Sequence, residues 1–224
     1  MTGGAAALRL AHRGDCRGAP ENSLAALAAA LANPACDGLE FDVRLGRDGV
    51  PVVLHDETLT RVQRRPGRVS DLAAAELAAA GIPRLEDALA AAGPDPFLDI
   101  ELKGDGHGTA TASVLRAGRG DEPSRAVVSA FEPPTLMVMR ELLPAWPRWL
   151  NAVDLSARTL ALASTLGCAG VSVMWAAITP RALRATTDAG LVVAAWTVRL
   201  PSTFERLARL GVVACCVEGA ALDG

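Results

Sequence analysis

Short apolar, β-branched runs alternate with longer Ala- and Leu-rich runs along this chain. The short runs predict strands at residues 8–12, 38–43, 97–103, 126–131, 149–153, 170–173, 192–198 and 212–218. The longer runs predict helices at residues 23–32, 71–80, 85–92, 110–117, 134–143, 156–166, 180–189 and 202–210. Eight strand–helix alternations in 224 residues predict an α/β fold, a (β/α)8 TIM barrel, with a doubly wound open sheet as the alternative.

One further apolar segment, residues 50–55, does not fit this alternation. It follows Asp48-Gly49, a dipeptide typical of tight hairpin turns. We therefore predict a small hairpin after the second strand, which would return His55 towards Glu40 and Asp42. No linker or low-complexity tract interrupts the chain, so residues 1–224 are expected to form a single barrel domain.

Composition narrows the class of protein. The chain is 50% hydrophobic with a net charge of −3, which argues against a nucleic-acid partner. The number of cysteines is five, and none are spaced Cys-x-x-Cys, so neither a disulfide framework nor a zinc site is expected. A reducing cytoplasm is the simplest location, and no segment predicts a stable membrane anchor.

Acidic residues recur two positions apart at predicted strand ends. Glu40 and Asp42 share one strand face, as do Asp99, Glu101 and Lys103. Barrel enzymes build their sites at the carboxyl ends of the strands, so these side chains are expected to converge there. Three converging carboxylates, Glu40, Asp42 and Glu101, predict a hard divalent cation, Mg²⁺ or Ca²⁺. The alternative is three solvated or salt-bridged acids.

Two of the three histidines end predicted β segments in the same region. His12 and His55 suit proton transfer near neutral pH, one accepting a proton from a nucleophile and the other donating one to a leaving group. Arg13 and Lys103 supply positive charge for a phosphodiester, unless they only pair with Glu40 or Asp99. The third histidine, His107, lies in a glycine-rich loop, residues 104–108, that lacks the ending of a Walker loop.

An ordered set of motifs now resembles the glycerophosphodiester phosphodiesterase family over essentially the whole chain. The matching segments are His12-Arg13-Gly14, Pro20-Glu21-Asn22-Ser23, residues 38–43, 48–59, 82–89 and 100–103, and, more weakly, 128–131 and 195–198. The resemblance implies a barrel related to that of phosphatidylinositol-specific phospholipases C. It also implies metal-dependent hydrolysis of a small-molecule glycerophosphodiester to glycerol 3-phosphate and an alcohol.

The resemblance also assigns roles to residues. His12 and His55 become the acid–base pair; Glu40, Asp42 and Glu101 become metal ligands; and Arg13 and Lys103 become phosphate contacts. Trp196 would cover the glycerol moiety, or would alternatively be a core aromatic. Trp146, Trp149 and Trp175 are expected to serve in packing. The cyclic-phosphate route and direct attack by water both stay open, as do the head group and the oligomeric state.

The chain departs from the family pattern at two places at the barrel mouth. Arg199 replaces the usual Asn after Trp-Thr-Val, and Val217-Glu218 replaces Thr-Asp. We expect Arg199 to pair with Glu218 rather than bind an acidic head group. Two other functions are considered: a related barrel phosphodiesterase acting on intact phospholipids, and a non-catalytic binder of a phosphorylated ligand. The first would need an interfacial apolar patch or secretion, and the sequence indicates neither.

Overall fold

The computed structural model describes residues 6–224. Its parallel strands close into a barrel, because β1 pairs with both β2 and β9. The barrel strands are β1 (Leu8–His12), β2 (Gly38–Leu45), β4 (Phe97–Leu102), β5 (Ala126–Ala130), β6 (Arg148–Ala152), β7 (Gly170–Met174), β8 (Val192–Val198) and β9 (Ala214–Val217). The (β/α)8 barrel prediction is confirmed, and closure of the sheet excludes the open-sheet alternative.

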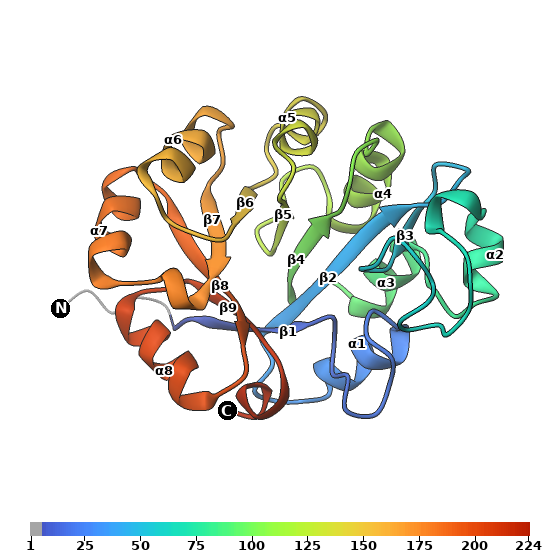
Figure 1. Ribbon diagram of the computed structural model, residues 1–224, viewed down its shortest axis with the longest axis horizontal. Helices are drawn as coiled ribbons and strands as arrows, with labels where there is room; N and C mark the ends of the chain where they lie inside the picture. The colour runs from blue at the N-terminus through green and yellow to red at the C-terminus, as the bar shows by residue number, and fades with distance from the viewer. Residues whose placement is uncertain (1–5) are drawn as a thin grey trace.

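Helices surround the barrel on its outer side (Figure 1). They are α1 (Leu24–Leu31), α3 (Leu85–Ala92), α4 (Thr109–Arg119), α5 (Pro133–Leu142), α6 (Ala157–Thr165), α7 (Pro180–Asp188) and α8 (Pro201–Leu210). The side chains of Ser23, Ser156 and Thr179 cap α1, α6 and α7 by accepting hydrogen bonds from main-chain amides. None of the helices in residues 6–224 is long and apolar enough to cross a membrane.

The predicted hairpin is present. Strand β3 (Pro51–Val53) runs antiparallel to the end of β2, with Val43 opposite Val53. This hairpin and α2 (Ala74–Ala78) enclose a separate apolar cluster that includes Val52, Leu59 and Leu77. The hairpin therefore has its own small core and holds the residues that follow β3 against the barrel mouth.

The predicted helix at 71–80 is only partly right, because the helix is shorter in the structure. The segment forms a 3₁₀ turn, Val69–Asp71, and the short helix α2, separated by an extended Leu72. The hairpin takes the main-chain groups that a continuous helix would have used. Arg47 donates its amide to the Leu72 carbonyl at 2.8 Å, and the Asp48 carboxylate accepts from the Ala74 amide at 3.0 Å.

Alternation along the strands separates an apolar shell from a polar interior. In β2, Leu39 and Phe41 join the core between barrel and helices, whereas Glu40 and Asp42 are buried on the opposite face. A further apolar cluster, distinct from the outer core and from the cluster under the hairpin, includes Leu10 and Trp149 and fills part of the barrel interior. Gly38 permits close strand approach, since a Cβ there would lie 2.0 Å from the Phe97 carbonyl oxygen. Apolar side chains thus occupy part of the barrel interior, and the buried acidic side chains lie towards the carboxyl ends of the strands.

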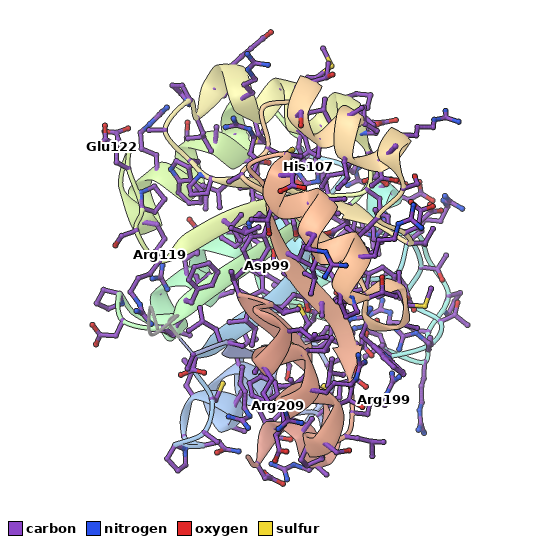
Figure 2. The ribbon with its side chains drawn as sticks, turned by 90° about the vertical axis from the view of Figure 1, so that its left-hand side faces the viewer. Asp99, His107, Arg119, Glu122, Arg199 and Arg209 are labelled. Carbon is purple, nitrogen blue, oxygen red and sulfur yellow. The ribbon has the colours of Figure 1, made fainter. Side chains whose placement is uncertain are left out.

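Figure 2 shows the two ends of the barrel. Arg199, which follows β8, lies at the end opposite Arg119 and Glu122, which lie at and just beyond the end of α4. Asp99 lies within the barrel between them. Arg199 therefore marks the face on which the carboxyl ends of the strands meet.

Candidate active site

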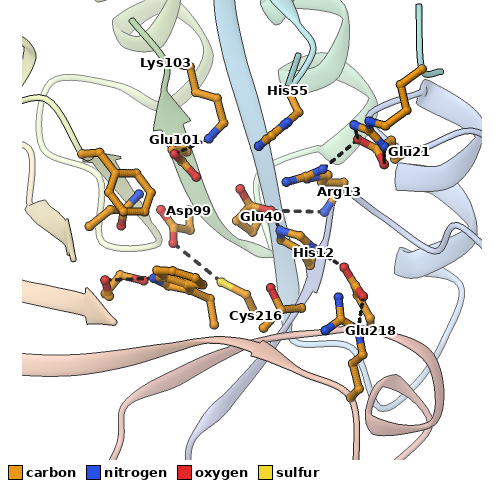
Figure 3. A pocket seen from close by; sticks show the side chains of 17 residues that line it. His12, Arg13, Glu21, Glu40, His55, Asp99, Glu101, Lys103, Cys216 and Glu218 are labelled. Carbon is orange, nitrogen blue, oxygen red and sulfur yellow. Dashed lines mark hydrogen bonds and ion pairs between the residues drawn. The ribbon is translucent and has the colours of Figure 1, made fainter. Parts of the chain in front are cut away.

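A cavity of about 460 Å³ opens at the carboxyl ends of the strands (Figure 3). The sequence-predicted residues in its wall are His12, Arg13, Glu40, His55, Glu101, Lys103 and Trp196. Asp42 is fully buried and forms ion pairs with Arg13 and Lys103, both of which line the cavity. The structure thus brings together all of the proposed site residues, which lie up to 184 positions apart in sequence between residues 12 and 196.

Glu40, Asp42 and Glu101 form the acidic centre of this site. One carboxylate oxygen from each lies within 4.8 Å of the others. Burial raises the pKa of Glu40 well above its usual range, and the neighbouring Asp42 and Glu101 raise it further. Burial and Asp42 likewise raise the pKa of Glu101. Such an arrangement is costly without compensating positive charge.

The donor set fits a hard divalent cation. Glu40 Oε1 is buried and has no hydrogen-bond partner among residues 6–224. Asp42 Oδ1 is buried and accepts no hydrogen bond from those residues either, although Lys103 Nζ lies 3.3 Å from it as an ion-pair partner. Both atoms are oxygens, the ligand type that Mg²⁺ and Ca²⁺ prefer, and Glu101 adds a third carboxylate to the same cluster. These residues could therefore hold such an ion.

Two basic side chains, Arg13 and Lys103, contact carboxylates of this acidic centre. Arg13 Nε lies 3.0 Å from Asp42 Oδ2, and its Nη1 donates to Glu21 at 2.8 Å. Lys103 Nζ lies 2.6 Å from Glu101 and 3.3 Å from Asp42. Burial opposes ionisation of Asp42, but Arg13 and Lys103 outweigh it and lower its pKa. The alternative partners considered from the sequence, Glu40 and Asp99, are not among these ion pairs, although Glu40 accepts a hydrogen bond from the Arg13 amide at 3.2 Å.

His12 is held by a carboxylate from the last strand end. Its Nδ1 lies 2.5 Å from Glu218 Oε1, and its Nε2 lies 3.8 Å from Glu40 Oε2. Arg199 Nε donates to the other oxygen of Glu218 at 2.8 Å, so the expected Arg199–Glu218 pair is confirmed. Because Glu218 engages Nδ1, the Nε2 atom is the one left facing the acidic cluster and the cavity.

His55 has a similar arrangement. Its Nδ1 lies 2.7 Å from Asp56 Oδ1, and Arg61 Nε donates to the second Asp56 oxygen at 2.6 Å. Arg61 also contacts Glu21, which links this group to Arg13. Burial lowers the pKa of His55, although Asp42 and Asp56 oppose the change. A neutral His55 near pH 7 is suited to accepting a proton.

Sequence reasoning overlooked three residues that organise the site. Asn22 is buried and donates to Asp42 Oδ2 at 2.8 Å, while its own oxygen accepts from the Asp42 amide at 3.3 Å. Glu21 and Arg61 join the loops that carry Arg13 and His55. Glu21 and Asn22 belong to the Pro-Glu-Asn-Ser motif, so the motif could have indicated that they contribute to the site. No sequence feature near Arg61 indicated its role.

The remaining aromatic and histidine predictions have mixed outcomes. Trp196 lines the cavity, packs edge-to-face on Phe131 at 5.8 Å, and donates to the Ser172 carbonyl at 3.0 Å. Trp146 and Trp149 are buried, in keeping with a packing role, whereas Trp175 is 37% exposed. His107 lies in the loop between β4 and α4, as expected. Its side chain is 3% exposed and is not among the residues of the active-site cavity wall.

The barrel, its acidic centre and its paired histidines define the class as a (β/α)8-barrel enzyme site suited to acid–base chemistry. Comparison with known proteins gives the family. Residues 12–219 match the model of the glycerophosphoryl diester phosphodiesterase family. The chain belongs to that family.

Individual relatives agree with this assignment. The chain is 27% identical over 92% of its length to a glycerophosphodiester phosphodiesterase of Caldanaerobacter subterraneus, covering 91% of that protein. It is 32% identical to probable glycerophosphodiester phosphodiesterase 2 of Mycobacterium tuberculosis, covering 92% of this chain and 84% of the relative. An Oleispira antarctica phosphodiesterase solved with its product sn-glycerol-3-phosphate superposes with a TM-score of 0.82 at 25% identity, covering 95% and 93% of the two chains.

Proposed function

We propose that this protein is a phosphoric diester hydrolase that cleaves glycerophosphodiesters to glycerol 3-phosphate and an alcohol. The observation that carries this proposal is the meeting of two carboxylate-held histidines with three clustered acids in one cavity. A protein that only bound a phosphorylated ligand would not need this acid–base pair. Family membership supports the same reaction.

The chain's own residues divide the work. One of His12 and His55 accepts the proton of the attacking hydroxyl or water, and the other donates a proton to the departing alcohol oxygen. Glu218 and Asp56 each engage Nδ1 of one histidine, which leaves its Nε2 for proton transfer. Arg13 and Lys103 offer charge-assisted hydrogen bonds to the phosphoryl oxygens, whose negative charge grows in the transition state.

A divalent cation belongs to this proposal. Members of the family depend on such an ion, and Glu40, Asp42 and Glu101 would hold it. When bound, the ion supplies Lewis-acid stabilisation of phosphoryl charge. The all-oxygen donor set favours Mg²⁺ or Ca²⁺ over zinc.

The direct test is release of glycerol 3-phosphate from glycerophosphocholine by the full chain. Release should stop with EDTA and return with Mg²⁺ or Ca²⁺. His12→Ala and His55→Ala should each lower the rate by about 10²–10⁴ for lost proton transfer. Phosphate binding without turnover of any glycerophosphodiester, with either ion, would instead identify a non-catalytic binder.

One observation favours a second candidate function, which is hydrolysis of phosphodiesters that still carry an acyl chain. Exposed apolar side chains follow four consecutive barrel strands on the active-site face: Phe131 after β5, Val153 after β6, Met174 and Trp175 at and after β7, and Leu200 after β8. Their exposed fractions run from 37% to 60%. The sequence had indicated no apolar patch, because these residues are scattered along the chain and meet only at the mouth of the barrel.

This rim makes the second candidate testable. Hydrolysis of lysophosphatidylcholine should fall in Leu200→Ser and Trp175→Ser, while hydrolysis of glycerophosphocholine stays unchanged. Met137→Ser is a matched control, since Met137 lies on α5 and is 55% exposed. Equal effects of the rim and control variants, or no lysophospholipid hydrolysis, would leave water-soluble diesters as the substrate.

A further inference from the structure

We infer that a second cavity, beside the active site, binds a phosphate-class anion. It encloses about 310 Å³ between the β2–β3 hairpin, residues 68–70 and the loop that follows β4. Its wall includes Arg44, Arg47, Arg68, Lys103, Gly104 and Asp105. Lys103 also lines the active site, so the two cavities share a wall residue.

Arg44 is the principal argument for a ligand. It is partly buried, and its Nε donates to the His55 carbonyl at 2.6 Å. Among residues 6–224, no hydrogen-bond acceptor or ion-pair partner contacts its two amino groups. A partly desolvated guanidinium with unused donors is the group that most readily binds a phosphate through two hydrogen bonds.

The glycine-rich loop adds main-chain donors. Within the described chain, the amides of Gly104 and Asp105 donate to no main-chain or side-chain acceptor. Gly104 has φ +79°, and a Cβ at this position would lie 3.7 Å from Arg44 Nη1. The guanidinium therefore lies close to Gly104, whose main-chain amide has no partner in the described residues, and such amides commonly bind anions. The glycine-rich loop, residues 104–108, would thus contribute main-chain donors to an anion site without being a Walker loop.

The charges of the wall leave Arg44 as the cation available to an anion. Arg47, Arg68 and Lys103 also line the cavity. They are already paired, Arg47 with Glu76 at 3.1 Å, Arg68 with Glu57 at 2.8 Å and Lys103 with Glu101 at 2.6 Å. A phosphate-class anion bound by Arg44 and the adjacent main chain fits this balance. Two sources share that chemistry: inorganic phosphate and a phosphate monoester such as glycerol 3-phosphate.

Equilibrium binding of inorganic phosphate to the full chain tests the proposal. Wild-type protein should bind phosphate at two sites. Arg44→Gln should weaken one of them by at least about tenfold, the effect of losing a charged hydrogen-bond donor, and Arg13→Gln should weaken the other. Arg65→Gln is the matched control, because Arg65 is exposed and does not line the cavity. Equal binding by Arg44→Gln and Arg65→Gln would overturn the proposal.

A second variant and a second measurement guard against misfolding of Arg44→Gln, which also loses the bond to the His55 carbonyl. Arg68→Gln keeps the bond to the His55 carbonyl, breaks only the exposed Arg68–Glu57 pair, and should weaken the same site. In NMR titrations, inorganic phosphate should shift the amides of Gly104 and Asp105 in wild type. Tighter binding of glycerol 3-phosphate in the same titration would identify a monoester as the ligand, and no shift with either probe would refute the site.

Discussion

Asn22 offers the sharpest test of how the acidic centre is held. Its side chain forms two hydrogen bonds with Asp42, of 2.8 Å and 3.3 Å, and is only 2% exposed. Its φ is +59°, a conformation that Asn tolerates better than Ala. Asn22→Ala therefore removes a donor to a buried carboxylate, leaves the Asp42 amide without its acceptor, and strains the main chain.

The expected cost follows from these three losses. A hydrogen bond to a charged group contributes about 1.5–3 kcal/mol, and a stranded buried amide costs about 1–3 kcal/mol. The left-handed conformation adds roughly 1–2 kcal/mol for Ala. Because such contributions are not additive, we expect the free energy of unfolding to fall by about 3–6 kcal/mol, a large share of the roughly 5–15 kcal/mol of a typical domain.

Urea unfolding of the EDTA-treated protein, followed by circular dichroism, measures this change. Asn22→Gly is the matched control, since Gly accepts a positive φ and loses only the hydrogen bonds. Asn22→Gly should therefore be more stable than Asn22→Ala by about 1 kcal/mol. An Asn22→Ala protein within about 1 kcal/mol of wild type would refute the reasoning, because a bond to a buried carboxylate is worth more than that.

Three further predictions follow from the contacts. Glu218→Gln should lower kcat by about 10²-fold or more with little change in KM, since it removes the charge that orients His12; an unchanged kcat in steady-state assays would contradict this role. Glu40→Gln should abolish the rise in Tm that Mg²⁺ or Ca²⁺ gives wild type. In EDTA the same variant should be more stable than wild type, because it relieves repulsion among the buried carboxylates; calorimetry measures both effects. Burial lowers the pKa of His107 to about 4, so wild type should lose up to about 3 kcal/mol of stability as pH falls from about 6.5 to 4; unfolding of His107→Gln should lack this loss, and an identical pH profile would count against it.

The sequence by itself determined the barrel and the direction of its acidic side chains. Strand and helix periodicities differ, so alternating patterns indicated each element wherever local preference and burial agreed. The two-residue repeat of a strand was enough to place Glu40 with Asp42, and Glu101 with Lys103, on shared faces. Asp48-Gly49 specified the hairpin that carries β3, because a tight turn depends on its own residues.

Only the tertiary structure decided which of these groups touch. Glu218 reaches His12 across 206 positions because closure of the barrel sets β9 beside β1. The pairing of Arg61 with Asp56 and Glu21 likewise depends on two loops meeting in space. The predicted helix at 71–80 is shorter in the structure for the same reason, since Asp48 and Arg47 from the hairpin bind the main chain where it would begin. Periodicity reports the environment of a residue within its own element, whereas long-range partners are fixed by how the elements pack.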